Sequence, residues 1–229
     1  MKRTKIFLII CLIMSFLSCD KIDNYDSPNG AVYGTLTDLM TNEGLQSEQP
    51  NGFTMKLFEK GGNKNSPITF YGKPDGTYEN AMIFQNEYKV LPAEGAFFAV
   101  DTAIVQVGSR TEQNFDVIPF LSVSNVSVTA SAGSITSNYR ITRQKVGDKI
   151  SERKTLVSRV PGVNNVTHEF SFQRTNLAST SDDEILATQF TDVVTGLTSG
   201  KTYYVRIAVR TNNALKKYNY SKVYPVTIP

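Results

Sequence analysis

The chain has 229 residues, of which 40% are hydrophobic and 20% charged, with 24 Lys and Arg against 21 Asp and Glu. Three of the basic residues lie in the first five positions, so the rest of the chain carries no net side-chain charge and suggests no nucleic-acid partner. One histidine, two cysteines and the lack of a P-loop, dinucleotide fingerprint or G-x-S-x-G motif lead us to expect no metal, no cofactor and no catalysis.

The N-terminus predicts a bacterial lipoprotein signal. Basic residues precede an apolar stretch that ends near Leu17 and is too short to span a bilayer. Cys19 follows the small residue Ser18, at the position where a lipoprotein precursor is cut and its cysteine acylated. We expect residues 1–18 to be the signal peptide and Cys19 to anchor the chain in a membrane. A free cysteine beside an ordinary signal peptidase site is the alternative.

Residues 19–29 are expected to form a flexible acidic tether, with Asp20, Asp23 and Asp26 among Gly, Pro and Asn. Acidic residues just behind the lipidated cysteine resemble the signal by which Bacteroidetes-type bacteria export lipoproteins to the outer face of the outer membrane. This resemblance implies a lipid-anchored protein of the outer membrane, displayed at the cell surface. A solvated tether without a routing role is the alternative.

The remaining chain predicts an all-β fold of two tandem β-sandwiches, over 30–119 and 120–229. Short runs of β-branched and aromatic residues alternate with turn residues, and no sustained 3.6-residue period occurs. The expected strands of the first domain are 31–37, 53–59, 68–71, 77–84, 87–91, 103–107 and 114–118. The Lys-Pro-Asp-Gly turn at 73–76 is expected to close a tight hairpin, with Gly76 at positive φ. The expected strands of the second domain are 121–130, 134–144, 153–160, 167–173, 187–194, 201–211 and 221–228.

The two halves carry opposite charge. Residues 20–119 hold 7 basic and 14 acidic side chains, a net charge of −7, whereas residues 120–229 hold 14 basic and 7 acidic, a net charge of +7. Three interpretations stay open. The domains attract and dock on each other, the second domain faces an acidic partner such as a uronate-rich glycan or a lipopolysaccharide phosphate, or the charges only solvate exposed strand faces.

The segment 196–211, GLTSGKTYYVRIAVRT, alternates inward residues at 203, 205, 207 and 209 with outward residues at 204, 206, 208 and 210. A leucine, a Gly-bearing turn and a Tyr-rich strand resemble the E–F corner of fibronectin type III domains. The resemblance implies that Tyr203, with Tyr204 as the other candidate, buries its ring and ties the corner through its hydroxyl.

The first half, with GAVYGTLTD, FTMKLFE, DGTYEN and EYKVL in order, resembles the prealbumin-like, carboxypeptidase-regulatory sandwich. Taken whole, the chain resembles a Bacteroidetes lipoprotein family of unknown function encoded in polysaccharide-utilisation loci. The resemblance implies a cell-surface protein that binds glycan or acts as an accessory capture component of a polysaccharide-uptake system. A structural module that binds a partner outer-membrane lipoprotein or transporter is the alternative.

Side chains suited to glycan binding are predicted in the loop 212–220. Tyr218 and Tyr220, next to Lys216 and Lys217, are expected to lie exposed at one end of the sandwich, where aromatic faces can stack on sugar rings. Ordinary exposed tyrosines are the alternative. Thr102, in Asp-Thr-Ala, fits the three-residue pattern that Bacteroidetes O-glycosylate.

Residues that could carry catalysis have simpler interpretations. His168 is expected on a strand of alternating pattern, as a core or edge residue. The acidic neighbours Asp182, Asp183 and Glu184 are expected in a solvated loop before a strand or a helical turn, and not as a carboxylate pair or a Ca²⁺ site.

Overall fold

The structure is a computed structural model, and it describes residues 26–63 and 65–229. The predicted signal peptide at 1–18 and the predicted lipid attachment site at Cys19 lie outside the described residues. No helix among the residues described is both long and apolar enough to cross a membrane.

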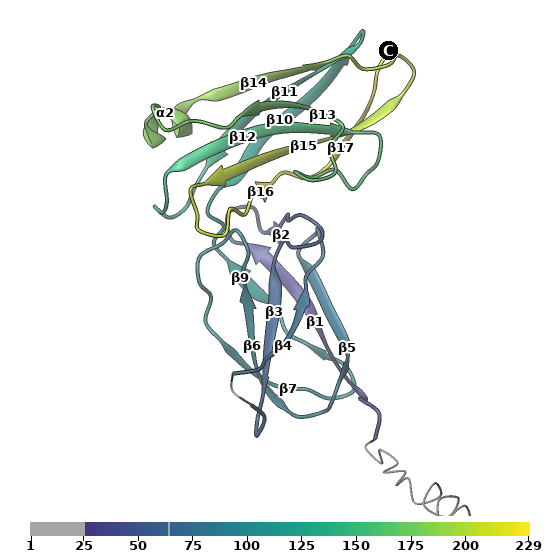
Figure 1. Cartoon of the computed structure of the whole chain (residues 1–229), viewed down its shortest axis with the longest axis vertical. Coiled ribbons are helices and arrows are strands. Elements are labelled where there is room, and N and C mark those ends of the chain that lie inside the picture. The colour runs from purple at the N-terminus through teal and green to yellow at the C-terminus, as the bar shows by residue number, and fades with distance from the viewer. Residues whose placement is uncertain (1–25, 64) are drawn as a thin grey trace, which may run out of the picture.

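The first domain is a sandwich of two sheets (Figure 1). Its strands are β1 (Gly30–Asp38), β2 (Glu43–Gly44), β3 (Thr54–Glu59), β4 (Ile68–Tyr71), β5 (Thr77–Ile83), β6 (Glu87–Ala93), β7 (Ala103–Gln106), β8 (Thr111–Glu112) and β9 (Phe115–Val117). One sheet has the order β2-β1-β5, with β8 and β9 pairing β1 in parallel, and the other has the order β4-β3-β6-β7. Alternating apolar residues of both sheets, among them Leu36, Met55 and Tyr88, meet in one buried core.

The second domain is also a two-sheet sandwich. Its elements are β10 (Ser122–Ser131), β11 (Ser134–Thr142), β12 (Ile150–Ser158), β13 (Phe170–Arg174), α2 (Asp182–Ala187), β14 (Gln189–Thr195), β15 (Thr202–Thr211), β16 (Asn219–Tyr220) and β17 (Tyr224–Thr227). The sheet β10-β11-β14 packs on the sheet β13-β12-β15, whose far edge is completed by β16 and β17. The prediction of an all-β fold with two sandwiches is confirmed.

The turn at 73–76 does not close a hairpin, so that prediction is wrong. Gly76 has the expected positive φ of 85°, but β4 pairs with β3 and β5 pairs with β1, which places the two strands in different sheets. A Cβ on Gly76 would lie 2.5 Å from the backbone nitrogen of Leu45. The glycine is therefore needed both for its φ and for the close approach of the chain that follows β2.

Tyr203 lies in the core of the second domain with 2% of its surface exposed, and its hydroxyl accepts a hydrogen bond from the Thr198 N–H at 3.0 Å. The bond joins the start of β15 to the turn before it. Tyr204 points to the opposite face of the strand and is half-buried. The polar end of Tyr203 thus satisfies a backbone donor while its ring packs edge-on against Phe170.

The two domains lie end to end (Figure 1). Hydrogen bonds to both domains hold the short segment that joins them. Phe97 forms an isolated bridge with Pro119, and the Ala96 carbonyl accepts from the Phe120 N–H at 3.1 Å. Asn219 of β16 completes the junction. Its Oδ1 accepts from the Leu121 N–H at 3.0 Å, and its Nδ2 donates to the Ala96 carbonyl at 2.8 Å. A buried side-chain amide therefore links the last strands of the second domain to the first domain.

We predict that Asn219→Ala lowers the free energy of unfolding by about 1–3 kcal/mol, because the buried Leu121 N–H loses its partner whereas the Ala96 carbonyl keeps that of Phe120. Urea denaturation measures the loss. Asn212→Ala, at an exposed position of the same segment, is the matched control and should stay within about 0.5 kcal/mol of the parent. Equal stability of the two variants would contradict the role assigned to Asn219.

Candidate functional site

The tyrosines predicted to bind glycan are not exposed, so that part of the prediction is wrong. Only 7% of Tyr218 and 6% of Tyr220 is accessible. The segment 212–220 does reach one end of the sandwich, but that end is covered by the first domain. Lys217 donates to the Asn51 carbonyl across the junction, and Lys216 stays exposed. Neither ring offers a free face on which a sugar could stack.

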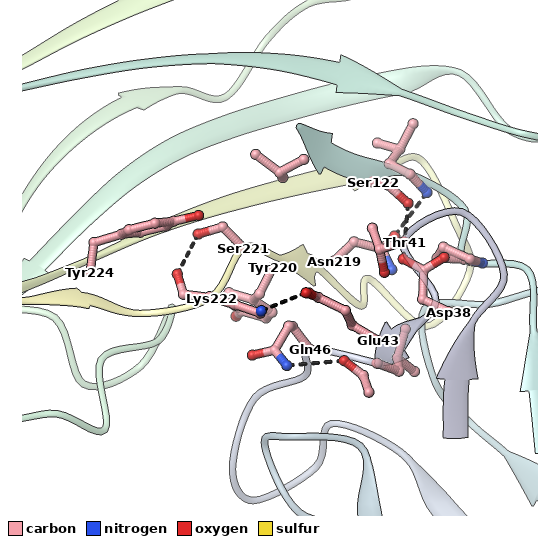
Figure 2. A pocket seen from close by; sticks show the side chains of 15 residues that line it. Asp38, Thr41, Glu43, Gln46, Ser122, Asn219, Tyr220, Ser221, Lys222 and Tyr224 are labelled. Carbon is pink, nitrogen blue, oxygen red and sulfur yellow. Dashed lines mark hydrogen bonds and ion pairs between the residues drawn. The ribbon is translucent and has the colours of Figure 1, made fainter. Parts of the chain in front are cut away.

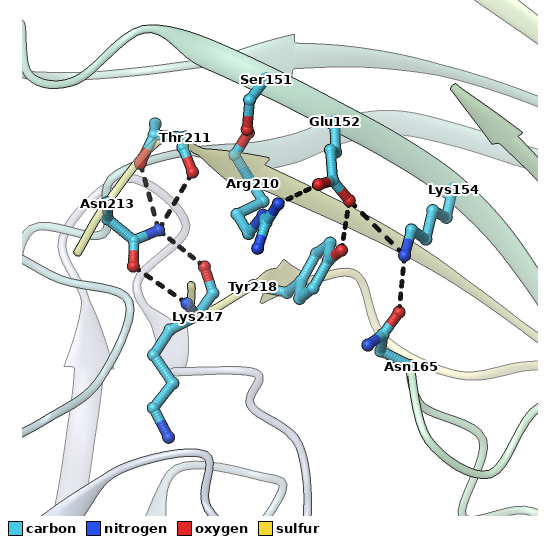
Figure 3. Close-up of polar contacts among 9 residues, drawn as sticks. All are labelled: Ser151, Glu152, Lys154, Asn165, Arg210, Thr211, Asn213, Lys217 and Tyr218. Atoms are coloured by element: carbon cyan, nitrogen blue, oxygen red, sulfur yellow. Dashed lines mark hydrogen bonds and ion pairs between the residues drawn. The ribbon is translucent and has the colours of Figure 1, made fainter. Parts of the chain in front are cut away.

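Both tyrosines instead cover charged side chains on the outer face of the sheet β13-β12-β15. Glu152 accepts from Arg210 and from the Tyr218 hydroxyl, and its carboxylate lies 3.5 Å from the Lys154 ammonium (Figure 3). Lys154 in turn donates to Asn165 at 2.8 Å. Burial lowers the pKa of Lys154 and raises that of Tyr218. The Arg210 Nε has no hydrogen-bond partner among the described residues, but the contacts that Glu152 makes with Arg210, Tyr218 and Lys154 hold the segment 212–220 on the sheet.

Arg206 precedes Arg210 on β15, on the same face of the sheet, and has a different environment. Only 3% of it is accessible, its guanidinium stacks 4.4 Å from the Tyr220 ring centroid, and its Nε donates to the Ser221 carbonyl at 2.9 Å. Tyr220 also donates to Glu48 of the first domain at 2.6 Å. Burial lowers the pKa of Arg206 to about 10, so the group stays charged at neutral pH.

Direct contacts hold the two domains together around these residues. The C-terminal domain contributes one partner to each bond and the N-terminal domain the other. The pairs are Ser122 with Asp38 at 3.2 Å, Lys222 with Glu43 at 2.7 Å, Tyr220 with Glu48 at 2.6 Å, and Asn164 with the Gln49 carbonyl at 3.1 Å. The docking of oppositely charged domains, one of the three interpretations of the charge split, is therefore what the structure displays.

A small cavity of about 230 Å³ lies between the domains (Figure 2). Side chains of the first domain that line it include Asp38, Glu43 and Gln46, and those of the second include Ser122, Asn219, Lys222 and Tyr224. Hydrogen bonds already join many of these groups: Ser122 to Asp38, Lys222 to Glu43, and Gln46 to the Gly44 carbonyl at 3.0 Å.

A larger groove of about 690 Å³ opens beside this cavity and shares Gln46 and Lys222 with it. Its remaining lining comes from both domains: Gln49, Pro74, Asp75, Pro161, Gly162, Asn164, Thr167, Arg206 and Val223. We call the cavity and the groove together the junction cleft. The volume of the groove lies in the range of small-ligand sites, about 300 to 1,000 Å³, and both apolar and polar side chains line it.

Burial raises the pKa of the Asp38 carboxyl above its ordinary value, although hydrogen bonds from Met40, Ser122 and Thr41 act in the opposite direction. The Oδ1 atom accepts the Met40 N–H at 2.7 Å, and Oδ2 accepts the Ser122 hydroxyl. Asp38 ends β1 at the junction, so its charge is desolvated by the domain that docks on it.

The residues considered for catalysis do not meet in this cleft. His168 precedes β13 and is half-buried, and its Nδ1 has no hydrogen-bond partner among the described residues. Asp182 begins α2 and pairs with Arg143 at 2.9 Å and Lys149 at 2.6 Å. Within residues 26–63 and 65–229, no group of three or more His, Cys, Asp or Glu side chains could hold a metal ion.

Thr102 is exposed just before β7, at the rim of a depression of about 710 Å³ on the outer face of β3 and β6. Phe58, Leu91 and Lys89 line the same depression. The threonine is accessible to a modifying enzyme, and its O-glycosylation stays a prediction.

Sequence reasoning missed Arg206, Gln46, Gln49 and Asn164, because none belongs to a recognisable motif. Arg206 was expected to point outward from its strand, and it does. The alternating pattern does not predict that Tyr220 and the first domain cover Arg206 and bury it.

Two consecutive segments match protein families. Residues 31–118 match "Protein of unknown function (DUF3823) N-terminal domain", and residues 121–225 match "Domain of unknown function (DUF3823_C)". Neither description names a catalytic activity. No curated protein sequence is significantly similar to this chain.

Several solved structures share the whole two-domain fold. A protein of Bacteroides uniformis, described as a "putative carbohydrate binding protein", has a TM-score of 0.73 and 23% identity, over 88% of this chain and 100% of its own. DUF3823 family proteins of Bacteroides uniformis and Parabacteroides merdae both have TM-scores of 0.74, at 22% and 20% identity, over the same shares. At these identities the likeness shows a common fold.

We predict that Asp38→Asn changes how stability depends on pH. The folded chain holds the Asp38 proton to higher pH than the unfolded chain does, so this carboxyl costs stability as pH rises through its raised pKa. The asparagine keeps an acceptor for Met40 and has no charge to desolvate. Urea denaturation between about pH 3.5 and 7 should show the variant gaining stability relative to the parent as pH rises. Asp116→Asn, at an exposed position, is the control. A relative loss with rising pH would contradict the prediction.

Proposed function

The chain belongs to the DUF3823 family, and we propose that it is a non-catalytic glycan-binding lipoprotein of the cell surface, which captures substrate for a polysaccharide-uptake system. The junction cleft is the observation that carries the proposal. Both domains contribute to it, and their docking fixes its shape. The description of the Bacteroides uniformis relative as a "putative carbohydrate binding protein" supports the same function.

The lining of the groove has the two kinds of surface that a sugar needs. Pro74, Pro161 and Val223 offer apolar faces for the C–H side of a pyranose ring. The amides of Gln46 and Gln49 can exchange hydrogen bonds with hydroxyl groups. Glycan binding needs a surface that complements the sugar in shape and polarity, and it needs no catalytic residues.

We predict that the lipid-free chain from Asp20 onward is retarded by at least one polysaccharide in affinity electrophoresis, and that Gly162→Leu weakens this by about tenfold or more. No described atom lies within 4 Å of a Cβ placed on Gly162, which lines the groove, so a leucine fits there without displacing the fold and adds bulk to the wall of the groove.

Gly108→Leu is the matched control. Its Cβ would have one described atom within 4 Å, the Thr111 hydroxyl at 3.8 Å, and Gly108 lies near the start of β1, far from the junction. Retardation that Gly162→Leu leaves unchanged would remove the groove from the proposal, and no retardation by any polysaccharide would contradict glycan binding.

A second candidate function is the binding of a partner outer-membrane lipoprotein or transporter. Within the part of the chain that the structure describes, strands β4 and β5 are each hydrogen-bonded to a single neighbour, and they carry exposed apolar side chains. Tyr71 on β4 is 54% exposed, and Met82 and Phe84, on and just after β5, are 73% and 44% exposed. Free edges with apolar side chains favour pairing with another chain. Co-purification from outer membranes that Met82→Lys abolishes would favour this alternative.

The surface location rests on Cys19, and we predict that Cys19→Ala moves the protein from the membrane fraction to the soluble fraction. Two or more acyl chains give stable attachment, which an uncut or unlipidated chain lacks. Fractionation with metabolic labelling by a fatty acid measures the change, with Cys11→Ala as control. Membrane association that persists without the label would overturn the lipoprotein assignment, and protease treatment of intact cells separates outward from inward display.

A further inference from the structure

Arg206 is a buried cation that forms no ion pair with a carboxylate of the described residues. Among the described residues no carboxylate lies within 4.0 Å of its guanidinium, and Nε, bonded to the Ser221 carbonyl, is its only nitrogen with a recorded hydrogen bond. Buried arginines are rare unless they are paired, because the desolvation of an unpaired charge is costly. Arg153, the other buried arginine among the described residues of this domain, follows that rule and bonds Asp192, and the half-buried Arg210 bonds Glu152.

Two acidic residues in this region, Glu48 and Asp75, do not form an ion pair with Arg206. Burial lowers the pKa of Arg206, and the charge of Glu48 opposes this only in part. The Glu48 carboxylate accepts the Tyr220 hydroxyl at 2.6 Å and forms no ion pair with the guanidinium. Asp75, which also lines the groove, accepts both the N–H and the hydroxyl of Thr77. Both carboxylates therefore have partners of their own.

The guanidinium is also held in a fixed orientation. One face stacks on the Tyr220 ring, and Nε is bonded to Ser221, so the edge with the two terminal amino groups is the part left for the groove that Arg206 lines. Two parallel N–H donors of this kind match the two oxygens of a carboxylate. An arginine fixed in advance loses little entropy when it binds an anion.

The second cation of the groove is not free in this way. Lys222 pairs with Glu43 at 2.7 Å, and both side chains are about half exposed, so the ammonium is compensated and solvated. Around Arg206 the groove then presents a guanidinium that is in no ion pair with a described carboxylate, apolar surfaces from Pro74 and Pro161, and the amide of Gln49 at its exposed rim.

We propose that Arg206 binds the carboxylate of a uronic acid unit in a glycan that lies in this groove, an inference that rests on the proposed glycan binding and narrows it to acidic glycans. The sugar ring then lies against the proline faces, and its hydroxyls reach the glutamine amides. A carboxylate presents two oxygens in the plane of the two terminal amino groups, and because the same two donors also match two oxygens of a tetrahedral sulfate, the experiment compares the two anions.

The test measures binding of the lipid-free chain from Asp20 onward, which keeps every described residue, by isothermal titration calorimetry. The ligands are polygalacturonate and alginate, methyl-esterified polygalacturonate as the same sugar without its charge, dextran sulfate, and a set of neutral polysaccharides. We expect binding of a uronate polymer that is lost on esterification. Arg206→Lys, which keeps the charge but loses the paired donors, should weaken it by about tenfold or more.

A second variant keeps the test decisive should Arg206→Lys fold poorly. Gln49→Glu adds a negative charge at the exposed rim, where the side chain has no recorded hydrogen bond among the described residues, and should weaken uronate binding by about threefold or more. Gln85→Glu makes the same charge change at the exposed end of the first domain, beside Asn29, and should leave binding unchanged.

The outcomes separate this inference from the proposed function. Binding of a neutral polysaccharide alone, or uronate binding that neither Arg206→Lys nor Gln49→Glu weakens, overturns the inference and leaves glycan binding standing. Equal or tighter binding of dextran sulfate overturns the choice of carboxylate. No binding of any polysaccharide overturns both.

Discussion

The structure depends on the hydrogen bonds that the Asn219 amide makes at the domain junction. The Leu121 N–H is buried where the chain passes from one sandwich to the other and bonds Asn219, and a buried backbone donor without a partner is costly. The same amide also donates to the Ala96 carbonyl of the first domain, which accepts from Phe120 as well. One side chain meets both groups only when the two domains are docked. The arrangement of the domains, and with it the cleft between them, follows from this requirement.

Docking also converts one face of a sheet from surface to interior. The outer face of β12 and β15 carries Glu152, Lys154, Arg206 and Arg210, which are ordinary residues for a strand in contact with water. Tyr218, Tyr220 and the first domain cover them, so their charges must be compensated locally. Glu152 provides this for Arg210 and Lys154. Arg206 is left with a hydrogen bond and an aromatic face, which is why it is the side chain most suited to meet a ligand.

The domains carry large opposite net charges, but ion pairs between them contribute little to the stability of the docked arrangement. Among the described residues a single ion pair, Lys222 with Glu43, crosses the junction, and its side chains are about half exposed. Exposed pairs of this kind contribute about 1 kcal/mol or less. The other polar contacts across the junction have at most one charged partner, as in Tyr220 with Glu48 and Lys217 with the Asn51 carbonyl. Directional hydrogen bonds therefore fix the docked arrangement.

The class of the fold and the inward faces of its strands could be predicted from the pattern of residues along the chain. In β15 the residues at 203, 205, 207 and 209 are buried as their alternation predicts, because side chains of a strand must point to opposite faces. Two-residue strands such as β2 and β16 escaped prediction, since so short a segment has no period to detect. Periodicity also cannot tell what covers the second face of a sheet. Tertiary structure alone decided that Tyr218 and Tyr220 are buried and that Arg206 lines a groove, because residues such as Glu48 and Gln49, more than 150 positions away along the chain, supply the other half of their surroundings.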